Sequence, residues 1–175
     1  VYKRQVFHCP YCHGYELGQG RIGIVATGAV SAHQAELLTE WGEVTLLLNG
    51  AFELADDVRH TLEGRGVAIE HTPIDRIEGV ADVVLADGRV LSFAGLFTAP
   101  RCAPSSGVAA AAGCALEDGP MGTQIVTDAE NKTSVRGIFA CGDVARAPHS
   151  VSLAVGHGAM AGIQVHRSLV WPDAS

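Results

Sequence analysis

The chain carries two cysteines three positions apart, Cys9 and Cys12, within the run His-Cys-Pro-Tyr-Cys-His-Gly-Tyr-Glu over residues 8–16. A Cys-x-x-Cys pair serves as a redox dithiol, as part of a zinc site or as a haem attachment site. A little further along, residues 22–28 read Ile-Gly-Ile-Val-Ala-Thr-Gly, the pattern of a buried strand and a dinucleotide-type turn. A dithiol placed just before such a turn indicates electron exchange between thiols and a bound cofactor.

Composition limits the class of protein. The 175 residues are 47% hydrophobic and carry a formal net charge of −7, which is typical of a globular protein and disfavours nucleic-acid binding. No apolar run approaches the roughly 20 residues of a membrane span, and no signal-peptide pattern opens the chain. The five cysteines do not resemble a secreted disulfide framework, so we expect a reducing cytoplasm. Cys102, Cys114 and Cys141 are expected to be small core residues.

The hydrophobic pattern predicts an α/β fold. Expected elements are a strand over 22–26, a helix over 30–41, a strand over 44–48, a helix over 52–66, strands over 67–70, 83–85, 89–91 and 96–99, a strand over 138–140 and a helix over 150–169. The first three form a β-α-β unit, and Asp87-Gly88 predicts a hairpin turn. The strand over 138–140 delivers Gly142 and Asp143 to its carboxyl end, where open α/β sheets bind ligands.

Three separated blocks, residues 9–16, 23–31 and 137–162, resemble the thioredoxin-reductase-like flavoproteins of the FAD/NAD(P)-binding pyridine nucleotide-disulfide oxidoreductase family. The resemblance implies a three-layer Rossmann-like NAD(P)-binding-like domain over 7–98 that carries the dithiol. It implies the C-terminal segment of a second, FAD-binding domain over 99–170. The family's N-terminal FAD segment has no counterpart in the sequence. We therefore expect a partial chain, a truncated relative or one part of a split protein that does not hold FAD tightly alone.

The resemblance also implies the site. FAD is the expected cofactor, no metal is expected, and the expected partners are a small dithiol or disulfide, or a thioredoxin-like protein, and a second copy in a homodimer. By family position Cys12 faces the flavin and Cys9 exchanges with the substrate. His13 stands where most members have aspartate and is expected to carry protons, because imidazole exchanges a proton near neutrality. The residues expected at cofactors are Gly142 and Asp143 on the ribityl chain, Ser150 and Val151 near the flavin ring, and Gly28 and Ser31 in the nucleotide-type turn.

A glycine-rich run over 156–162, Gly-His-Gly-Ala-Met-Ala-Gly, superficially matches a phosphate-binding motif. That motif needs a strand before it and a strand-to-helix turn within it. By family position the run lies inside a helix, where small residues allow close packing. Packing is therefore the preferred interpretation.

Other interpretations of the dithiol remain open. Cys-Pro-Tyr-Cys is also the glutaredoxin motif, although the glycines at 14, 18 and 20 disfavour a helix after Cys12. Cys-x-x-Cys-His is the string of c-type haem attachment sites, which leaves Gly142-Asp143 unexplained. Zinc has four potential ligands here: His8, Cys9, Cys12 and His13. Ligands so close in sequence rarely complete a tetrahedron unaided.

Two features disfavour a nicotinamide cofactor. Ala26 replaces the first glycine of the family's turn, and its methyl group hinders the approach of backbone to a pyrophosphate. The acidic residues Glu53, Asp56 and Asp57 follow the second strand and would repel a 2′-phosphate. Related dithiol oxidases pass electrons from a dithiol through flavin to oxygen, and we retain this route beside NAD(P)H-driven reduction. Two further alternatives are a truncated, non-catalytic Rossmann-like domain that has lost its cofactor and a thiol carrier without flavin.

Overall fold

The computed structural model describes residues 6–172. The chain divides into two compact units, Val1–Pro100 and Arg101–Ser175, which we call unit 1 and unit 2 and describe separately. No helix within residues 6–172 is long and apolar enough to cross a membrane.

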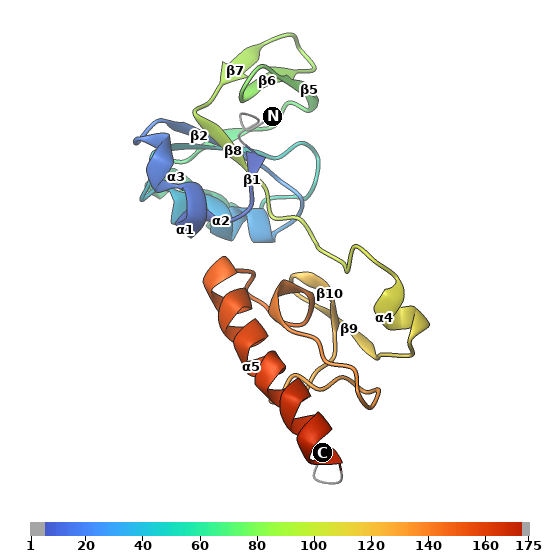
Figure 1. Ribbon diagram of the computed structural model, residues 1–175. Helices are drawn as coiled ribbons and strands as arrows, with labels where there is room; N and C mark the ends of the chain where they lie inside the picture. Colours follow the sequence, from blue (N-terminus) through green and yellow to red (C-terminus); the bar gives the residue numbers. More distant parts are fainter. Residues whose placement is uncertain (1–5, 173–175) are drawn as a thin grey trace. The chain divides into compact units, whose positions relative to one another are not determined.

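Five parallel strands form the central sheet of unit 1, in the order β1-β8-β2-β3-β4. In that order their bounds are Val6–Phe7, Gly95–Phe97, Arg21–Val25, Glu43–Leu47 and Ala68–Glu70. Parallel neighbours need a crossover connection. Helix α2 (Val30–Leu38) connects β2 to β3, and α3 (Asp56–Gly64) connects β3 to β4. The predicted β-α-β unit is confirmed (Figure 1).

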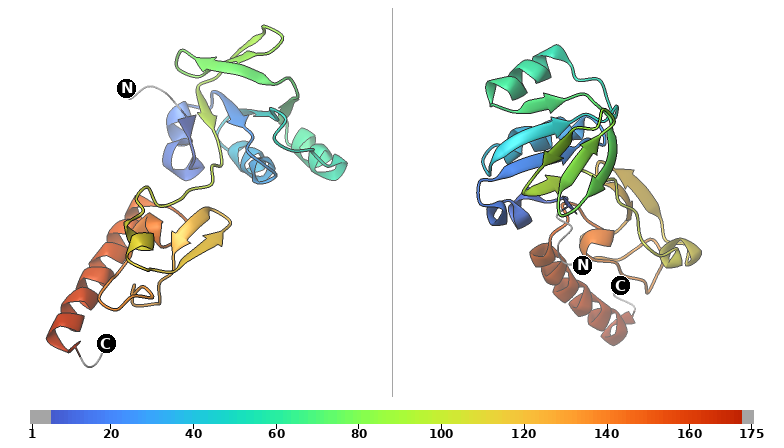
Figure 2. Two further views of the ribbon diagram at one scale, coloured as in Figure 1. Left: turned by 90° about the vertical axis from the view of Figure 1, so that its right-hand side faces the viewer. Right: turned by 90° about the horizontal axis from the view of Figure 1, so that it is seen from above.

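Unit 1 has three layers because its strands are apolar on both faces. Successive residues of a strand face opposite sides, so Leu46 and Leu48 pack against α2 and α3 while Leu47 joins a second core. That second core is covered by a three-stranded antiparallel sheet, β5-β6-β7, with bounds Ile74–Glu78, Asp82–Leu85 and Val90–Ser92. Helices, parallel sheet and antiparallel sheet stack in this order (Figures 1 and 2), which confirms the predicted α/β class.

The hairpin predicted around Asp87-Gly88 is confirmed, since β6 pairs antiparallel with β7. Gly88 has a φ of +87°, which glycine adopts without steric cost. The side chain of Arg89 extends from this hairpin to Glu70, at the end of β4, with 2.8 Å between Nη1 and Oε2. This ion pair ties the antiparallel sheet to the edge of the central sheet.

Unit 2 has less regular structure and a smaller core. Its elements are α4 (Val108–Ala111), β9 (Leu116–Gly119), β10 (Gly122–Ile125), a 3₁₀ turn over Gly142–Val144 and the helix α5 (Val151–Val170). Strands β9 and β10 form an antiparallel hairpin. The core is built from Cys114, Ile125, Ala140 and Ala145. The predicted helix over 150–169 is confirmed as α5, the longest helix in Figure 1.

Two expected elements need correction. The helix expected over 52–66 begins only at Asp56, because Ala55 has extended backbone and the carboxylates of Asp56 and Asp57 stabilise the first turn of α3. The strand expected over 138–140 does not form. Phe139 makes one isolated bridge with Lys132, and a strand needs a longer ladder to be stable. The sequence pattern did not indicate β5, β9 or β10.

The sequence predicted that the three isolated cysteines lie in the core. This prediction is confirmed for Cys114 and wrong for Cys102. Cys114 is buried in the core of unit 2, Cys141 is half-buried and Cys102 is exposed. Flanking apolar residues therefore did not determine the burial of each thiol.

Glu70→Gln tests the tie between the two sheets of unit 1. Hydrogen bonds from Arg89 and Thr72 lower the pKa of Glu70 to about 2, from an ordinary value of 4.5. Because the pKa is lower in the folded state, the stabilisation is complete above the ordinary value and is lost as the pH falls toward 2. We expect the substitution to lower the free energy of unfolding at pH 7 by about 1 kcal/mol, a small effect because Arg89 is half exposed.

Urea titrations at pH 7 and at about pH 3.5, between the two pKa values, measure this difference. The control is Glu78→Gln, which removes a carboxylate from an exposed pair with Arg76. Equal losses for the two variants, or a loss that does not shrink at the lower pH, would contradict the assignment.

Candidate active site

The dithiol lies where β1 ends and a single helical turn begins. Phe7 pairs with Phe97 of β8 and closes the strand. Helix α1 (Pro10–His13) follows, with Pro10 at its first position, where a missing N–H costs nothing. Cys9 immediately precedes the helix in extended conformation, and its carbonyl accepts the N–H of Cys12 at 3.3 Å. One turn of backbone therefore brings the two cysteines together.

Both thiols are free, with Cys9 half-buried and Cys12 exposed. The hydrogen bond between the Cys12 thiol and Cys9, together with slight desolvation and the charge of Cys9, raises the pKa of Cys12. Cys12 thus holds its proton more tightly than its exposure suggests. A thiolate, not a thiol, is the nucleophile in disulfide exchange, so the raised pKa makes Cys12 less ready to attack a disulfide at a given pH.

His13 is held by an aromatic ring and a carboxylate. Its ring stacks on Phe7, with centroids 4.4 Å apart and planes inclined by 20°. Its Nδ1 lies 3.5 Å from Glu16 Oε2. His13 is the last residue of α1, the helix that directly follows Cys9 and contains Cys12. The structure therefore brings together the three expected catalytic residues, Cys9, Cys12 and His13.

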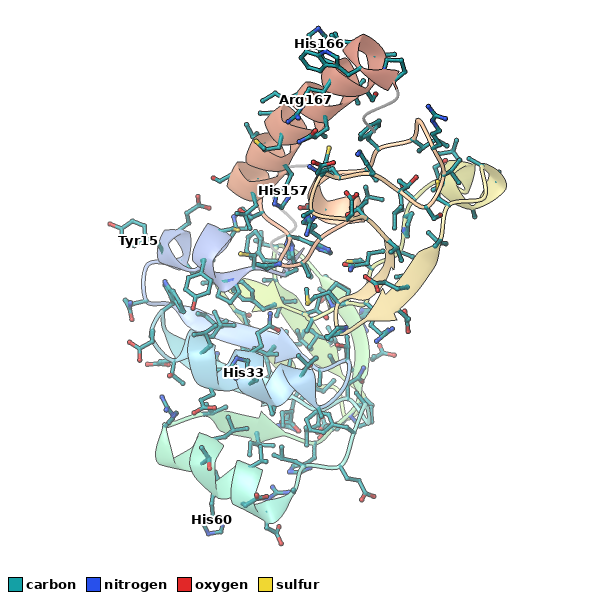
Figure 3. The ribbon with its side chains drawn as sticks, turned by 90° about the horizontal axis from the view of Figure 1, so that it is seen from below. Tyr15, His33, His60, His157, His166 and Arg167 are labelled. Atoms are coloured by element: carbon teal, nitrogen blue, oxygen red, sulfur yellow. The ribbon has the colours of Figure 1, made fainter. Side chains whose placement is uncertain are left out.

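Two tyrosines lie within and just after the dithiol motif in the sequence, Tyr11 and Tyr15. Tyr11 contacts Trp41 edge-on at 5.6 Å between centroids. Trp41 also packs on Gly14, where a Cβ would lie within 2.8 Å of the indole ring, so only glycine fits. Tyr15 is 92% exposed, and Figure 3 shows its side chain projecting away from the ribbon.

The expected nucleotide-type turn between β2 and α2 satisfies its own groups. The N–H of Thr27 donates to Ser31 Oγ at 3.1 Å, and the Thr27 hydroxyl donates to the Ala99 carbonyl at 2.8 Å. Ser31 is fully buried. The structure therefore gives Ser31 a part in shaping the turn, beside Gly28, and keeps its hydroxyl away from solvent.

Asp143 lies in unit 2 at a cavity of about 320 Å³, which is also lined by Thr123 and His149. Its Oδ1 accepts the N–H of Ser150 at 3.1 Å, so the carboxylate caps the start of α5. Gly142 has a φ of +70°, and a Cβ there would lie 3.2 Å from Ala154 of α5. The structure thus brings Gly142, Asp143 and Ser150 together. Val151 follows, 82% exposed, on the first turn of α5.

The glycine-rich run over 156–162 lies within α5, as predicted, so it forms no phosphate-binding turn. Ala161 of this run is buried, as expected for close packing, but the three glycines of the run are not closely packed. A Cβ at Gly156, Gly158 or Gly162 would meet open space. Large apolar side chains on the same helix are also exposed: Val151, Leu153, Val155, Met160, Ile163, Val165, Leu169 and Val170.

Three residues of the dithiol region were missed from the sequence. Glu16 has a sequence signal, because a carboxylate three positions after a histidine on a helical turn can pair with it. Phe7 and Gln34, whose side chain binds the carbonyl of His8, give no such signal, because tertiary packing brings them there. Within residues 6–172 no group of three or more His, Cys, Asp or Glu is arranged to hold a metal ion.

Residues 13–158 match the family model of pyridine nucleotide-disulphide oxidoreductases. The chain belongs to this family. Among curated members, it is 31% identical to thioredoxin reductase sirT of Leptosphaeria maculans over 97% of this chain. The structure of an oxidoreductase from Agrobacterium tumefaciens is 52% identical over 99% of this chain, with a TM-score of 0.91. The thioredoxin reductase of Streptococcus pyogenes is 26% identical over 95%, with a TM-score of 0.76.

This pyridine nucleotide-disulphide oxidoreductase chain is shorter than these relatives. It spans 57% of the Leptosphaeria protein and 60% of the Agrobacterium chain. The likeness therefore extends over nearly all of this chain and over little more than half of each relative.

Cys9→Ala tests whether Cys9 raises the pKa of Cys12. Removing the Cys9 sulfur removes the main cause of the raised pKa of Cys12, so more Cys12 is ionised at a given pH. We expect Cys12 to react with iodoacetamide faster at pH 8, by up to about tenfold, since one pKa unit changes the thiolate fraction tenfold. Peptide mapping by mass spectrometry measures the rate at Cys12.

The exposed Cys102 provides an internal control in the same digest, because it is no part of the pair. Its rate should be equal in the two proteins. An unchanged or slower reaction at Cys12 would show that the Cys9 sulfur does not retain the proton.

Proposed function

We propose that this chain exchanges electrons between FAD and a substrate dithiol or disulfide through Cys9 and Cys12. The observation that carries the proposal is the thiol pair on one helical turn, in which the hydrogen bond to Cys9 raises the pKa of Cys12. An inert pair of cysteines needs no such arrangement, whereas disulfide exchange needs one sulfur ready to attack and a second ready to resolve. Membership of the family supports the same chemistry.

Reduction of a substrate disulfide would proceed in two exchange steps. The Cys9 thiolate attacks one substrate sulfur, the substrate S–S bond breaks, and a mixed disulfide forms. The leaving thiolate takes a proton, which His13, on the helical turn that follows Cys9, would supply. Cys12 then loses its proton and attacks the Cys9 sulfur, which releases the second thiol and leaves a Cys9–Cys12 disulfide. The same steps in reverse oxidise a substrate dithiol.

FAD, when bound, supplies or accepts the electron pair of this dithiol. The residues of unit 2 fit the ribityl and ring part of FAD. Asp143 uses one oxygen to cap α5, so its other oxygen would accept a ribityl hydroxyl, and the close approach of Gly142 to α5 leaves the carboxylate at the cavity. Ser150 and Val151 would lie near the ring. The cavity of about 320 Å³ is at the lower end of the range for ligand pockets, so this chain alone would hold FAD weakly.

The exposed apolar face of α5 supports this view of unit 2. A large exposed apolar surface usually marks an interface. The relatives are longer than this chain, and the part of them that it does not match would complete the FAD domain against α5. A homodimer in a reducing cytoplasm, acting on a small dithiol or on a thioredoxin-like protein, completes the proposal.

A second candidate function is that of a dithiol oxidase. In that reaction electrons pass from a substrate dithiol through the flavin to oxygen, and NAD(P)H does not supply electrons. Gly28 and Ser31 were expected at a nicotinamide cofactor, but the Ser31 hydroxyl is buried and already bonded to Thr27. Asp56 and Asp57 begin α3 and would repel a 2′-phosphate. Dithiol-dependent oxygen uptake without NADPH oxidation distinguishes a dithiol oxidase from a reductase.

Cys12→Ser is expected to trap the substrate on Cys9. Serine cannot resolve a mixed disulfide, so the first exchange step would stop there. After incubation with 5,5′-dithiobis(2-nitrobenzoate), the variant should carry one thionitrobenzoate on Cys9, detected by mass spectrometry of the Cys9 peptide. In the parent protein Cys12 should resolve the mixed disulfide, so that the Cys9 peptide carries no stable thionitrobenzoate. A parent protein that keeps the adduct on Cys9, or a Cys12→Ser variant that carries none there, would contradict the proposed roles.

Asp143→Ala tests the flavin site in the protein as its gene encodes it. Loss of a charged acceptor costs about 1.5–3 kcal/mol, so FAD affinity should fall at least about tenfold. Flavin absorbance and fluorescence titration measure this affinity. Glu130→Ala, which removes an exposed carboxylate paired with Lys132, should leave the affinity unchanged. A parent protein that remains colourless after reconstitution with FAD would contradict the flavin assignment and favour a non-catalytic domain.

A further inference from the structure

Among the described residues, Gln34 is the side chain that ties the dithiol segment to the rest of unit 1 by a hydrogen bond. Its Nε2 donates to the carbonyl oxygen of His8 at 3.0 Å. The ladder of β1 ends one residue earlier, where the Phe7 carbonyl accepts the N–H of Thr98. The other described hydrogen bonds of residues 8–12 are local to the segment, formed with the Cys12 and Gly14 backbone and between the two thiols.

This hydrogen bond comes at a cost in free energy. Gln34 is only 8% exposed, and its Oε1 is buried without a partner. A buried carbonyl without a hydrogen bond costs about 1–3 kcal/mol. Methionine has nearly the same length and would avoid that cost, and α2 already packs on the core through Ala32, Ala35 and Leu38. What glutamine alone supplies here is the Nε2 donor to His8.

We propose that Gln34 is a positioning residue for the dithiol, which holds the His8 carbonyl and thereby sets Cys9 against Cys12. The inference rests on the proposed function of this pair. Cys9 follows His8 directly and has extended backbone, with φ −112° and ψ 113°. A shift at His8 therefore moves Cys9, while Cys12 stays on α1. Cys9 and Cys12 are not joined by a disulfide in the structure, so the geometry that the Gln34 hydrogen bond holds is that of the dithiol.

The balance between dithiol and disulfide measures this stabilisation. In glutathione buffer, the Cys9 thiolate attacks glutathione disulfide and releases one glutathione thiolate. Cys12 then attacks the Cys9 sulfur and releases the second. One S–S bond breaks and another forms, and the two protons of the dithiol end on two glutathione thiols. At a fixed glutathione ratio, the disulfide-to-dithiol ratio reports the relative stability of the two forms.

Gln34→Met and Gln34→Leu both remove the donor, the first at nearly constant side-chain length. We expect each to raise the disulfide-to-dithiol ratio of Cys9–Cys12 by at least about threefold at a fixed glutathione ratio. The matched control is Gln19→Met, because Gln19 also donates through Nε2 to a backbone carbonyl of unit 1, that of Glu40. Its ratio should stay within about twofold of the parent value. Alkylation followed by mass spectrometry measures all four proteins.

A purely structural role of Gln34 predicts a different result, namely a loss of stability without a change in the disulfide-to-dithiol ratio. If the Gln34 variants melt at a lower temperature but keep the parent ratio, or shift it toward the dithiol, the inference is overturned. If both variants fail to fold, NMR spectra of the unaltered protein in its reduced and oxidised forms test the inference instead. The side-chain amide resonances of Gln34 should move in NMR spectra when Cys9–Cys12 is oxidised and those of Gln19 should not, and a stationary Gln34 signal overturns the inference. Failure of Cys9 and Cys12 to form a disulfide at any glutathione ratio would instead refute the proposed function.

Discussion

The parallel pairing of β1 with β8 determines where the dithiol lies. The strand is only Val6–Phe7, yet its register places Phe7 beside Phe97 and ends the ladder two residues before Cys9. Phe7 then has two neighbours, the core aromatic Phe97 and the ring of His13. A slip of one residue would turn Phe7 to the opposite face of the sheet. The stack on His13 would be lost, and the start of α1 would be displaced along the sheet edge.

The sequence predicts the parts of this arrangement that depend on local pattern. Runs such as residues 44–48 are apolar throughout because both faces of a parallel strand are buried, and Asp87-Gly88 specifies a tight turn. The four-residue helix α1 is too short to show a hydrophobic period. Gln34 is 26 positions from the carbonyl it binds, and only the folded sheet brings the two together. The dithiol was therefore visible in the sequence, whereas most of the groups that hold it were not.

In unit 2, by contrast, sequence patterns indicated packing that the structure shows only in part. Its sequence contains strand-like residues at 138–140 and small residues along α5, both of which are patterns of close packing. The structure gives the first a single bridge and the second an open face. The strand does not form, and close packing on α5 is seen only at Ala161 among the described small residues of the 156–162 run. The physical reason is shared, since a pattern reports what a segment can pack against, not whether the partner is present among the described residues. The small core around Cys114 and Ile125 is correspondingly modest for a unit of this length.

Asp143 caps the start of α5 by accepting the N–H of Ser150, and the same carboxylate lines the cavity of unit 2. The stability of the first turn of α5 is therefore linked to ligand binding in that cavity. The first turn of a helix frays when its N–H groups lack acceptors, and here the acceptor also faces the cavity. Any ligand that binds the second carboxylate oxygen would restrict the rotation of Asp143 and so strengthen the cap. By mass action the reverse also holds, because an ordered first turn raises affinity for that ligand. The start of α5 and the cavity therefore form one thermodynamic unit, in which fraying and ligand release are two sides of the same equilibrium.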